Sequence, residues 1–309
     1  MTTERIAVIG AGLMGHGIAQ VFAVAGHAVR VFDAAADALA SLRERIARNL
    51  VDLGQDRAAA ERVTPVAELG ECVAQADVVF EAGPEDLAWK RAMFERLHLL
   101  TPAHATLASN TSVIPITEIM AGLALSGSGQ RALGTHWWNP PYLVPLVEVV
   151  KTPHTEAGVA QKMFDLLARV GKTPAMVEKD VPGFIGNRLQ HALWREAIAL
   201  VADGVCDAHT VDTVVKASFG RRLPVLGPLE NADLVGLDLT RAIHRTVLPA
   251  IDVTPGPNPL LDELIGAGRL GMKSGEGFRR WSADEQLALR QRVLQHLKAM
   301  NAADHGQPA

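Results

Sequence analysis

One histidine and one glutamate have the types and the spacing that acid–base chemistry requires. They are His136 and Glu148, at the ends of the stretch HWWNPPYLVPLVE, in which apolar residues predominate. Imidazole titrates near neutral pH, so it can accept the proton of a hydroxyl group. A carboxylate bonded to its far nitrogen fixes the tautomer and stabilises the imidazolium as it forms. We therefore predict that His136 is a general base and that Glu148 orients it.

A glycine-rich segment near the N-terminus has the pattern of a dinucleotide-binding loop. It consists of Gly10, Ala11, Gly12, Leu13, Met14 and Gly15. An apolar strand signal precedes the segment and an apolar helix over residues 13–25 follows it. Glycines let backbone amides at the helix N-terminus approach a pyrophosphate, whose charge the helix dipole favours.

A second predicted strand, residues 28–33, completes a βαβ unit and ends at Asp33. This acid lies 18 positions after Gly15, close to where the dinucleotide pattern places the carboxylate that binds the adenosine ribose. Asp33 also repels a 2′-phosphate, and no arginine follows it. The sequence therefore predicts NAD as the cofactor in preference to NADP.

Further strand signals continue this sheet, and ligands bind at the carboxyl ends of parallel strands, where Glu85, Ser112 and His136 fall. The predicted strands span residues 76–81, 105–109, 132–136, 146–150 and 174–177. The pattern breaks at residues 179–183 and continues as helices. We predict an α/β fold, with a Rossmann-like N-terminal domain and a mostly parallel sheet, followed by an all-α C-terminal domain. The predicted domains are residues 1–180 and 181–309.

Composition narrows the class of protein. The chain has 309 residues, a net charge of −4 and 48% hydrophobic residues, without the basic excess that nucleic-acid binding favours. Cys72 and Cys206 are the two cysteines, which fits a reducing compartment. We find no metal-ligand cluster, signal peptide or membrane span, and we expect a cytoplasmic protein without a membrane partner. Arg43, Arg45 and Arg48, in a helical segment over residues 36–62, are expected to line a solvated face.

Several motifs in a fixed order resemble the 3-hydroxyacyl-CoA dehydrogenase family. Besides the glycine loop and the His136–Glu148 stretch, they are SNTS at 109–112, PGFIGNR at 182–188, GP at 227–228, VGLD at 235–238 and GMKSGEGF at 271–278. The resemblance implies NAD-dependent oxidation of an L-3-hydroxyl group of a small molecule, and a homodimer formed through the helical domain.

The same resemblance implies roles for individual residues. The family's catalytic pair matches His136 and Glu148, and its substrate-polarising positions match Ser112 and Asn187. By analogy, Ser112, Glu85, Lys90 and Asn139 surround the nicotinamide end of the cofactor. Trp137 and Trp138 replace a pair of phenylalanines that is more typical of the family, and they either shape a pocket wall or pack in the core.

The departures from the family concern the substrate. Acyl-CoA members have a longer, lysine-rich helical arm after the second strand, whereas this arm is short and carries arginines. The segments 139–142 and 220–228 resemble the branch that contains lambda-crystallin, L-gulonate 3-dehydrogenase and carnitine dehydrogenase, which acts on free hydroxy acids. Arg222 is expected to bind a substrate carboxylate. We predict a short free 3-hydroxy carboxylate as substrate, with a short L-3-hydroxyacyl-CoA as the alternative.

Two alternatives from other classes stay open. One is a nonenzymatic, crystallin-like NAD-binding protein, against which the four residues His136, Glu148, Ser112 and Asn187 argue. The other is a dehydrogenase of the 2-methyl or phosphogluconate type, which relays its proton through a lysine on the interdomain helix. Here that helix begins Gly-Asn-Arg at 186–188, without a lysine.

Overall fold

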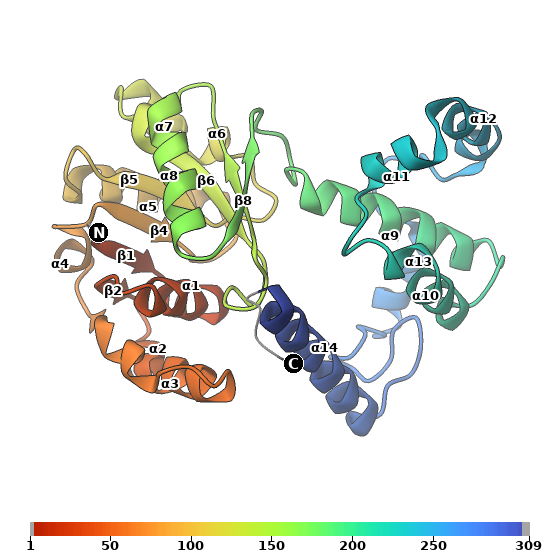
Figure 1. Cartoon of the computed structure of the whole chain (residues 1–309), viewed down its shortest axis with the longest axis horizontal. Helices are drawn as coiled ribbons and strands as arrows, with labels where there is room; N and C mark the ends of the chain where they lie inside the picture. The colour runs from red at the N-terminus through yellow and green to blue at the C-terminus, as the bar shows by residue number, and fades with distance from the viewer. Residues whose placement is uncertain (1–2, 305–309) are drawn as a thin grey trace. The chain divides into compact units, whose positions relative to one another are not determined.

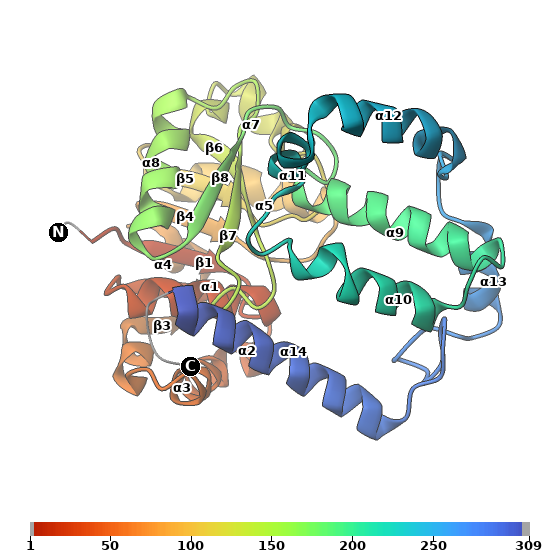
Figure 2. The same ribbon diagram turned by 45° about the vertical axis from the view of Figure 1, so that its right-hand side comes forward.

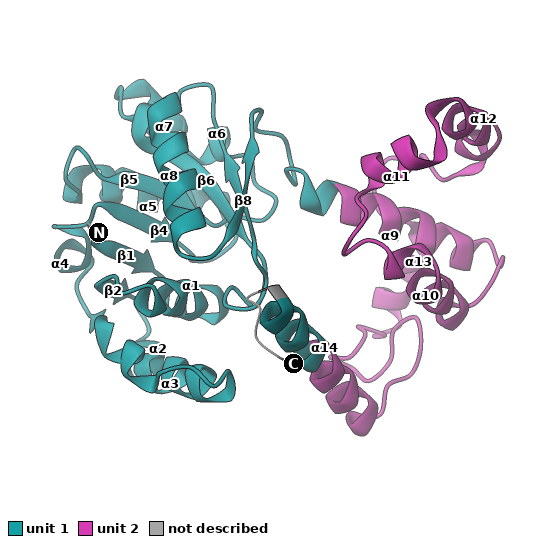
Figure 3. Ribbon diagram, in the orientation of Figure 1, with its two compact units in different colours: residues 1–188, 294–309 teal, residues 189–293 magenta. Residues whose placement is uncertain are grey.

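The computed structural model describes residues 3–304 and divides into two compact units (Figure 3). The first unit contains the chain up to Arg188 together with the C-terminal segment from Leu294. The second unit contains Leu189–Val293. The sheet and all residues of the predicted catalytic group belong to the first unit.

The first unit is built on an eight-stranded sheet with the strand order β3-β2-β1-β4-β5-β6-β7-β8 (Figure 1). Strands β1 to β6 are parallel, β7 is antiparallel to β6, and β8 is parallel to β7. The order of the first six strands is that of a doubly wound dinucleotide-binding sheet. The strands are β1 (Ile6–Ile9), β2 (Val29–Phe32), β3 (Val63–Val66), β4 (Val78–Glu81), β5 (Thr106–Ser109), β6 (Ala132–Trp137), β7 (Leu146–Val150) and β8 (Thr173–Val177).

Helices cover both faces of this sheet, because successive side chains of each strand point to opposite faces. In β1, Ile6 and Val8 join one buried cluster with α1 and α3, whereas Ala7 and Ile9 join another with α4 and α5. Helix α8 lies along β8 (Figures 1 and 2). The helices of this unit are α1 (Leu13–Val24), α2 (Ala36–Ala40), α3 (Leu42–Asp52), α4 (Leu69–Val73), α5 (Leu87–Leu100), α6 (Ile116–Ile119), α7 (Ala121–Leu125) and α8 (Ala157–Arg169), with short 3-10 turns at Arg57–Arg62 and Gly129–Arg131.

This architecture confirms the predicted fold class and corrects two details. The first is strand β3, which lies outside the strands predicted from the sequence and whose residues VTPV include a proline. That proline is tolerated because β3 is at the edge of the sheet, where one side of the backbone needs no strand partner.

The second correction concerns Arg45, one of the three arginines of the arm (residues 36–62) that the sequence placed on a solvated face. Arg43 Nε donates to Val63 O at 2.6 Å, and Arg45 Nη2 donates to Ala11 O at 2.6 Å. Arg43 and Arg48 are exposed, as the sequence predicted, and Arg48 pairs with Glu44, whereas Arg45 is half-buried. Two of the three guanidinium groups therefore hold the fold together, and Arg45 supports the glycine loop directly.

The second unit is helical, and its helices leave many apolar side chains uncovered. Within it, Ala199 and Leu264 are the buried hydrophobic residues among those described, whereas Trp194, Leu239 and Ile243 are about half exposed. Its elements are α9 (Gly186–Ala202), which starts in the first unit, α10 (Ala208–Ala217), α11 (Pro228–Val235), α12 (Leu237–Val247), α13 (Pro259–Gly266), the first part of α14 (Ala283–Asp304), and 3-10 turns at Phe219–Arg221 and Leu248–Ala250. None of the helices within residues 3–304 is long and apolar enough to cross a bilayer.

Candidate active site

His136 and Glu148 lie directly opposite each other on the antiparallel strands β6 and β7. Cross-strand partners on one face have their Cβ atoms about 5 Å apart, so this register brings the two side chains together. His136 Nδ1 lies 2.7 Å from Glu148 Oε2, and both side chains are buried, at 4% and 1% exposure. A carboxylate only accepts hydrogen bonds, so Nδ1 carries a proton, and in the neutral imidazole Nε2 then has a free lone pair.

The second oxygen of Glu148 holds the start of helix α9. Glu148 Oε1 accepts hydrogen bonds from the backbone amides of Ile185 at 2.8 Å and Gly186 at 3.0 Å. Burial raises the pKa of Glu148, but the hydrogen bonds from His136 and from these two amides outweigh it and lower the pKa below its ordinary value. Glu148 is therefore an ionised carboxylate that joins the imidazole to the helix N-terminus.

Aromatic rings surround the imidazole. The ring centroids of Trp138 and Phe184 lie 5.2 Å and 5.6 Å from that of His136. Trp137 points to the other face of β6, where it packs in the core against Phe22 and Phe80. The two tryptophans thus take both of the roles that the sequence left open, since Trp137 is a core residue and Trp138 forms a wall beside the imidazole.

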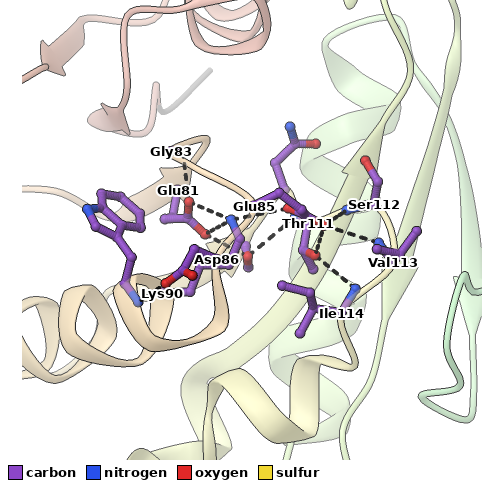
Figure 4. A network of polar contacts seen from close by, with 12 residues as sticks. Glu81, Gly83, Glu85, Asp86, Lys90, Thr111, Ser112, Val113 and Ile114 are labelled. Atoms are coloured by element: carbon purple, nitrogen blue, oxygen red, sulfur yellow. Dashed lines mark hydrogen bonds and ion pairs between the residues drawn. The ribbon is translucent and has the colours of Figure 1, made fainter. Parts of the chain in front are cut away.

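Ser112 and Asn187 come from segments far apart in the sequence and meet at the same place. Asn187 Nδ2, in the first turn of α9, donates to Ser112 O at 2.8 Å. Ser112 follows β5 and is exposed, as is Asn139, which follows β6. Glu85 Oε1 accepts a hydrogen bond from the backbone amide of Ser112 at 3.0 Å (Figure 4).

Lys90 has a buried partner that was not predicted from the sequence. Its Nζ donates to both carboxylate oxygens of Glu81, at 2.8 Å and 2.9 Å, and Lys90 is 1% exposed. Glu81 ends the apolar strand β4 in the way that Asp33 follows β2. An acid at the end of a buried strand was thus a signal in the sequence for both residues.

The glycine loop has the shape that a dinucleotide requires. A Cβ at Gly15 would lie 1.8 Å from Gly10 O, so this glycine permits close packing of the helix on the loop. Gly10 adopts a φ of +106°, and a Cβ there would lie 2.6 Å from Ala82 O. At Gly12, in contrast, a Cβ would meet no atom within 4 Å. Gly12 therefore borders open space, into which a pyrophosphate fits.

Asp33 lies beside this loop and is fixed by it. Its carboxylate oxygens accept the backbone amides of Ala11 at 2.7 Å and Ala35 at 2.8 Å. Asp33 also lines a cavity of about 450 Å³ together with Gly10, Gly12, Trp89 and Arg96. Its lining by the glycine loop and by the acid after β2 is what the adenosine half of a dinucleotide would require.

Arg222 belongs to the second unit. It is exposed and lines a cavity of about 240 Å³ with Phe219, Leu226 and Asn231. No group of three or more His, Cys, Asp or Glu residues that fits a metal ion occurs within residues 3–304.

A doubly wound sheet, a glycine loop with an acid after the second strand, and a buried histidine–carboxylate pair define the class of NAD-dependent dehydrogenases. The model for the NAD-binding domain of 3-hydroxyacyl-CoA dehydrogenase matches residues 5–181, and the model for the C-terminal domain of the same enzymes matches residues 183–281. The chain belongs to the 3-hydroxyacyl-CoA dehydrogenase family, and its cofactor is NAD.

Individual relatives differ in the substrates that their names give. The chain is 38% identical over 286 residues to a probable 3-hydroxybutyryl-CoA dehydrogenase of Bacillus subtilis, covering 90% of this chain and 97% of the relative. It is 39% identical over 237 residues to L-carnitine dehydrogenase of Streptomyces griseus, covering 75% and 70%. A solved structure of 5-formyl-3-hydroxy-2-methylpyridine 4-carboxylic acid 5-dehydrogenase, an NAD⁺-dependent dismutase, matches with a TM-score of 0.90 and 31% identity, covering 99% of this chain and 100% of that one.

Proposed function

We propose that the protein oxidises the 3-hydroxyl group of a short 3-hydroxy carboxylate, with His136 as the general base. The observation that carries this proposal is the buried bond from His136 Nδ1 to Glu148 Oε2, which leaves Nε2 as a proton acceptor. Bound NAD supplies the hydride acceptor. The hydroxyl proton moves to Nε2 as the hydride leaves the carbon atom that bears the hydroxyl group, and the alcohol becomes a carbonyl group. Glu148 stabilises the positive charge that forms on the ring.

The other residues of the site bind and orient the reactants. Ser112 and Asn187 polarise the substrate oxygen by donating hydrogen bonds to it. Glu85 and Asn139 lie near the nicotinamide ribose and carboxamide, and the loop Gly10–Gly15 with Asp33 holds the pyrophosphate and the adenosine ribose. Trp138 and Phe184 exclude water from the imidazole, which strengthens its interaction with the carboxylate.

The arm after β2 favours a free acid over a CoA thioester. Arg43 and Arg45 donate to backbone carbonyl groups of the fold and Arg48 pairs with Glu44, so that none of the three is a cation without a partner. The phosphates of CoA need several such cations. We propose that Arg222 instead binds the substrate carboxylate, and that a short L-3-hydroxyacyl-CoA is the alternative substrate.

The proposal also covers the domain bounds, the oligomeric state and the location of the protein. We propose an NAD-binding domain over residues 1–180 and a helical domain for substrate binding and dimerisation over 181–309. The uncovered apolar side chains of the second unit support a homodimer, since helices with such surfaces need burial. A cytoplasmic location fits two free cysteines, Cys72 and Cys206.

A second candidate reaction is the oxidation of an aldehyde on a carboxylate-bearing ring. It is favoured by the TM-score of 0.90 to the pyridine-carboxylic acid dehydrogenase over nearly the whole of both chains. The hydrate of an aldehyde offers a hydroxyl group on a carbon that bears hydrogen, so the same base serves both reactions.

A screen for NADH formation distinguishes these substrates. Purified protein and NAD⁺ are mixed with 3-hydroxybutyrate, gulonate, carnitine, 3-hydroxybutyryl-CoA or a pyridine aldehyde carboxylate, and kcat/KM is compared. The proposal expects the highest kcat/KM for a free 3-hydroxy acid. A higher value for the thioester contradicts the free-acid assignment, and NADH formation from the aldehyde alone favours the second candidate.

A further inference from the structure

The turn that carries Ser112 is organised by one oxygen atom of Glu85 (Figure 4). Glu85 Oε1 accepts hydrogen bonds from Thr111 Oγ1 at 2.6 Å, Ser112 N at 3.0 Å and Val113 N at 3.3 Å. Thr111 Oγ1 also accepts the backbone amide of Ile114 at 3.1 Å. These four bonds fix the backbone of the turn from its first residue to its last.

The two residues at the start of this turn differ in solvent exposure. Thr111 is fully buried, whereas Ser112 is exposed. A bound substrate therefore does not reach Thr111, and a change at Thr111 acts on the substrate only through the turn and through Glu85. On its other side the turn is held by Asn187, whose Nδ2 donates to Ser112 O.

A buried ion pair holds the segment from which Glu85 projects. Glu81 accepts both hydrogen bonds of Lys90, the backbone amide of Gly83 at 2.7 Å and the hydroxyl of Ser109 at 2.7 Å. These contacts tie the ends of β4 and β5 to the first turn of α5. All four lone-pair directions of the Glu81 carboxylate are thus used, as a buried charge requires.

Lys90 also faces Glu85. Its Nζ lies 3.7 Å from Glu85 Oε2, the oxygen that the turn does not use, and the Glu85 side chain is 40% exposed. The two groups are within ion-pair distance, so the ammonium of Lys90 attracts this carboxylate. The burial of Lys90 favours an action through Glu85 over the direct cofactor contact that the resemblance implies.

We propose that Glu85 is a positioning residue that holds the Thr111–Val113 turn in the conformation that presents Ser112 to the substrate. Lys90, which is held by Glu81, orients the Glu85 carboxylate. This inference rests on the proposed function, in which Ser112 binds the substrate oxygen. Glu85 then couples the two ligands, because its Oε1 holds the substrate turn while its Oε2, 3.7 Å from Lys90 Nζ, is not used by the turn and is left to meet the cofactor that the resemblance places beside Glu85.

Hydrogen exchange tests the hold on the turn without any need for activity. Thr111→Val keeps the shape of the side chain and removes the hydroxyl that bonds Glu85. Amide exchange in a peptide over residues 110–116 is expected to accelerate about 10-fold or more in Thr111→Val, which removes a charge-assisted hydrogen bond, and in Glu85→Gln, which turns three charge-assisted hydrogen bonds into weaker neutral ones. An exchange rate equal to that of the wild type in both variants overturns the proposal.

Thr135→Val is the matched control. Thr135 is fully buried on β6, its hydroxyl has no hydrogen-bond partner within the described part of the chain, and its side chain points away from the face of His136. The same substitution there is expected to leave exchange in the 110–116 peptide, turnover and NADH affinity unchanged.

Kinetics then test the role in catalysis, with the best substrate from the screen. Thr111→Val is expected to lower kcat/KM about 10-fold while the NADH Kd changes less than about twofold, because Thr111 bonds Oε1 of Glu85, the oxygen that holds the turn, and leaves Oε2 unchanged. Glu85→Gln is expected to change both quantities. The double variant is expected to resemble Glu85→Gln alone, since residues that act through one another are not additive.

Additive losses in the double variant, or an unchanged kcat/KM in Thr111→Val, overturn the positioning role. If the wild type forms no NADH with any compound of the screen, the proposed function fails. The exchange measurement and the NADH affinity of Glu85→Gln still decide whether Glu85 holds the turn and faces the cofactor.

Discussion

Replacing Glu148 with glutamine is a sharp test of the catalytic pair, because the structure dictates how the amide must turn. The backbone amides of Ile185 and Gly186 only donate, so the carbonyl oxygen of the new side chain faces them. The NH₂ group then faces His136 Nδ1, which must become an acceptor. The ring proton moves to Nε2, and the atom that would take the substrate proton is no longer free.

The expected loss follows from this change of tautomer. Loss of a well-placed general base lowers kcat by about 10²- to 10⁴-fold. At 1.36 kcal/mol per tenfold, this corresponds to about 3 to 5 kcal/mol of transition-state stabilisation. The fold is expected to survive, because the glutamine side chain keeps the volume of the glutamate that it replaces and the two hydrogen bonds to α9.

The assay is steady-state NADH formation together with NADH binding measured by fluorescence. Glu148→Gln is expected to lose kcat and to keep the NADH Kd of the wild type, since Glu148 lies outside the glycine loop. Glu178→Gln is the matched control, because that glutamate follows the neighbouring strand β8 with a side chain that is 68% exposed. Full turnover of Glu148→Gln, or an equal loss in the control, refutes the reasoning.

Three further predictions concern the cofactor loop and stability. Gly12→Ala is expected to keep the melting temperature and to weaken NADH binding about tenfold or more, because its Cβ enters the open space above the loop; tight NADH binding by this variant contradicts the cofactor assignment. Gly15→Ala is expected to lower the melting temperature, since its Cβ would lie 1.8 Å from a carbonyl oxygen, and an unchanged value in a thermal scan counts against that packing. Asp77→Asn is expected to lower the urea midpoint at pH 7. The hydrogen bond and charge of Arg5 hold the pKa of Asp77 below its ordinary value of 3.8. The stabilisation of the fold by the ionised Asp77 is therefore complete above pH 3.8 and fades as the pH falls below it. A difference between variant and wild type that persists undiminished at pH 2 opposes this attribution.

The sequence was sufficient for the fold class because local patterns specify it. The glycine loop and the alternation of apolar strands with helices predict a doubly wound sheet, and the strand order confirms it. The direction of β7 was not predictable, because apolar periodicity is the same in parallel and antiparallel strands. Strand β3 was missed because Pro65 argues against a strand wherever the neighbours are unknown.

The individual residues of the site were predictable by type, but their partners were not. His136 and Glu148 stood out through their spacing, yet it is the antiparallel register that places them opposite each other. Arg45 looked like a solvated charge because its acceptor, Ala11 O, lies 34 positions away in the sequence. Glu81 carried the same signal as Asp33, an acid at the end of an apolar strand, but its pairing with Lys90 was not predictable, because that lysine lies in the following helix.

The most direct test of the central claim is a single-turnover measurement of NADH formation by His136→Gln with excess enzyme over substrate. The claim that His136 takes the hydroxyl proton predicts a chemical step about 10²- to 10⁴-fold slower than in the wild type, with cofactor affinity retained. A chemical step as fast as that of the wild type would contradict it, and another residue would have to be the base.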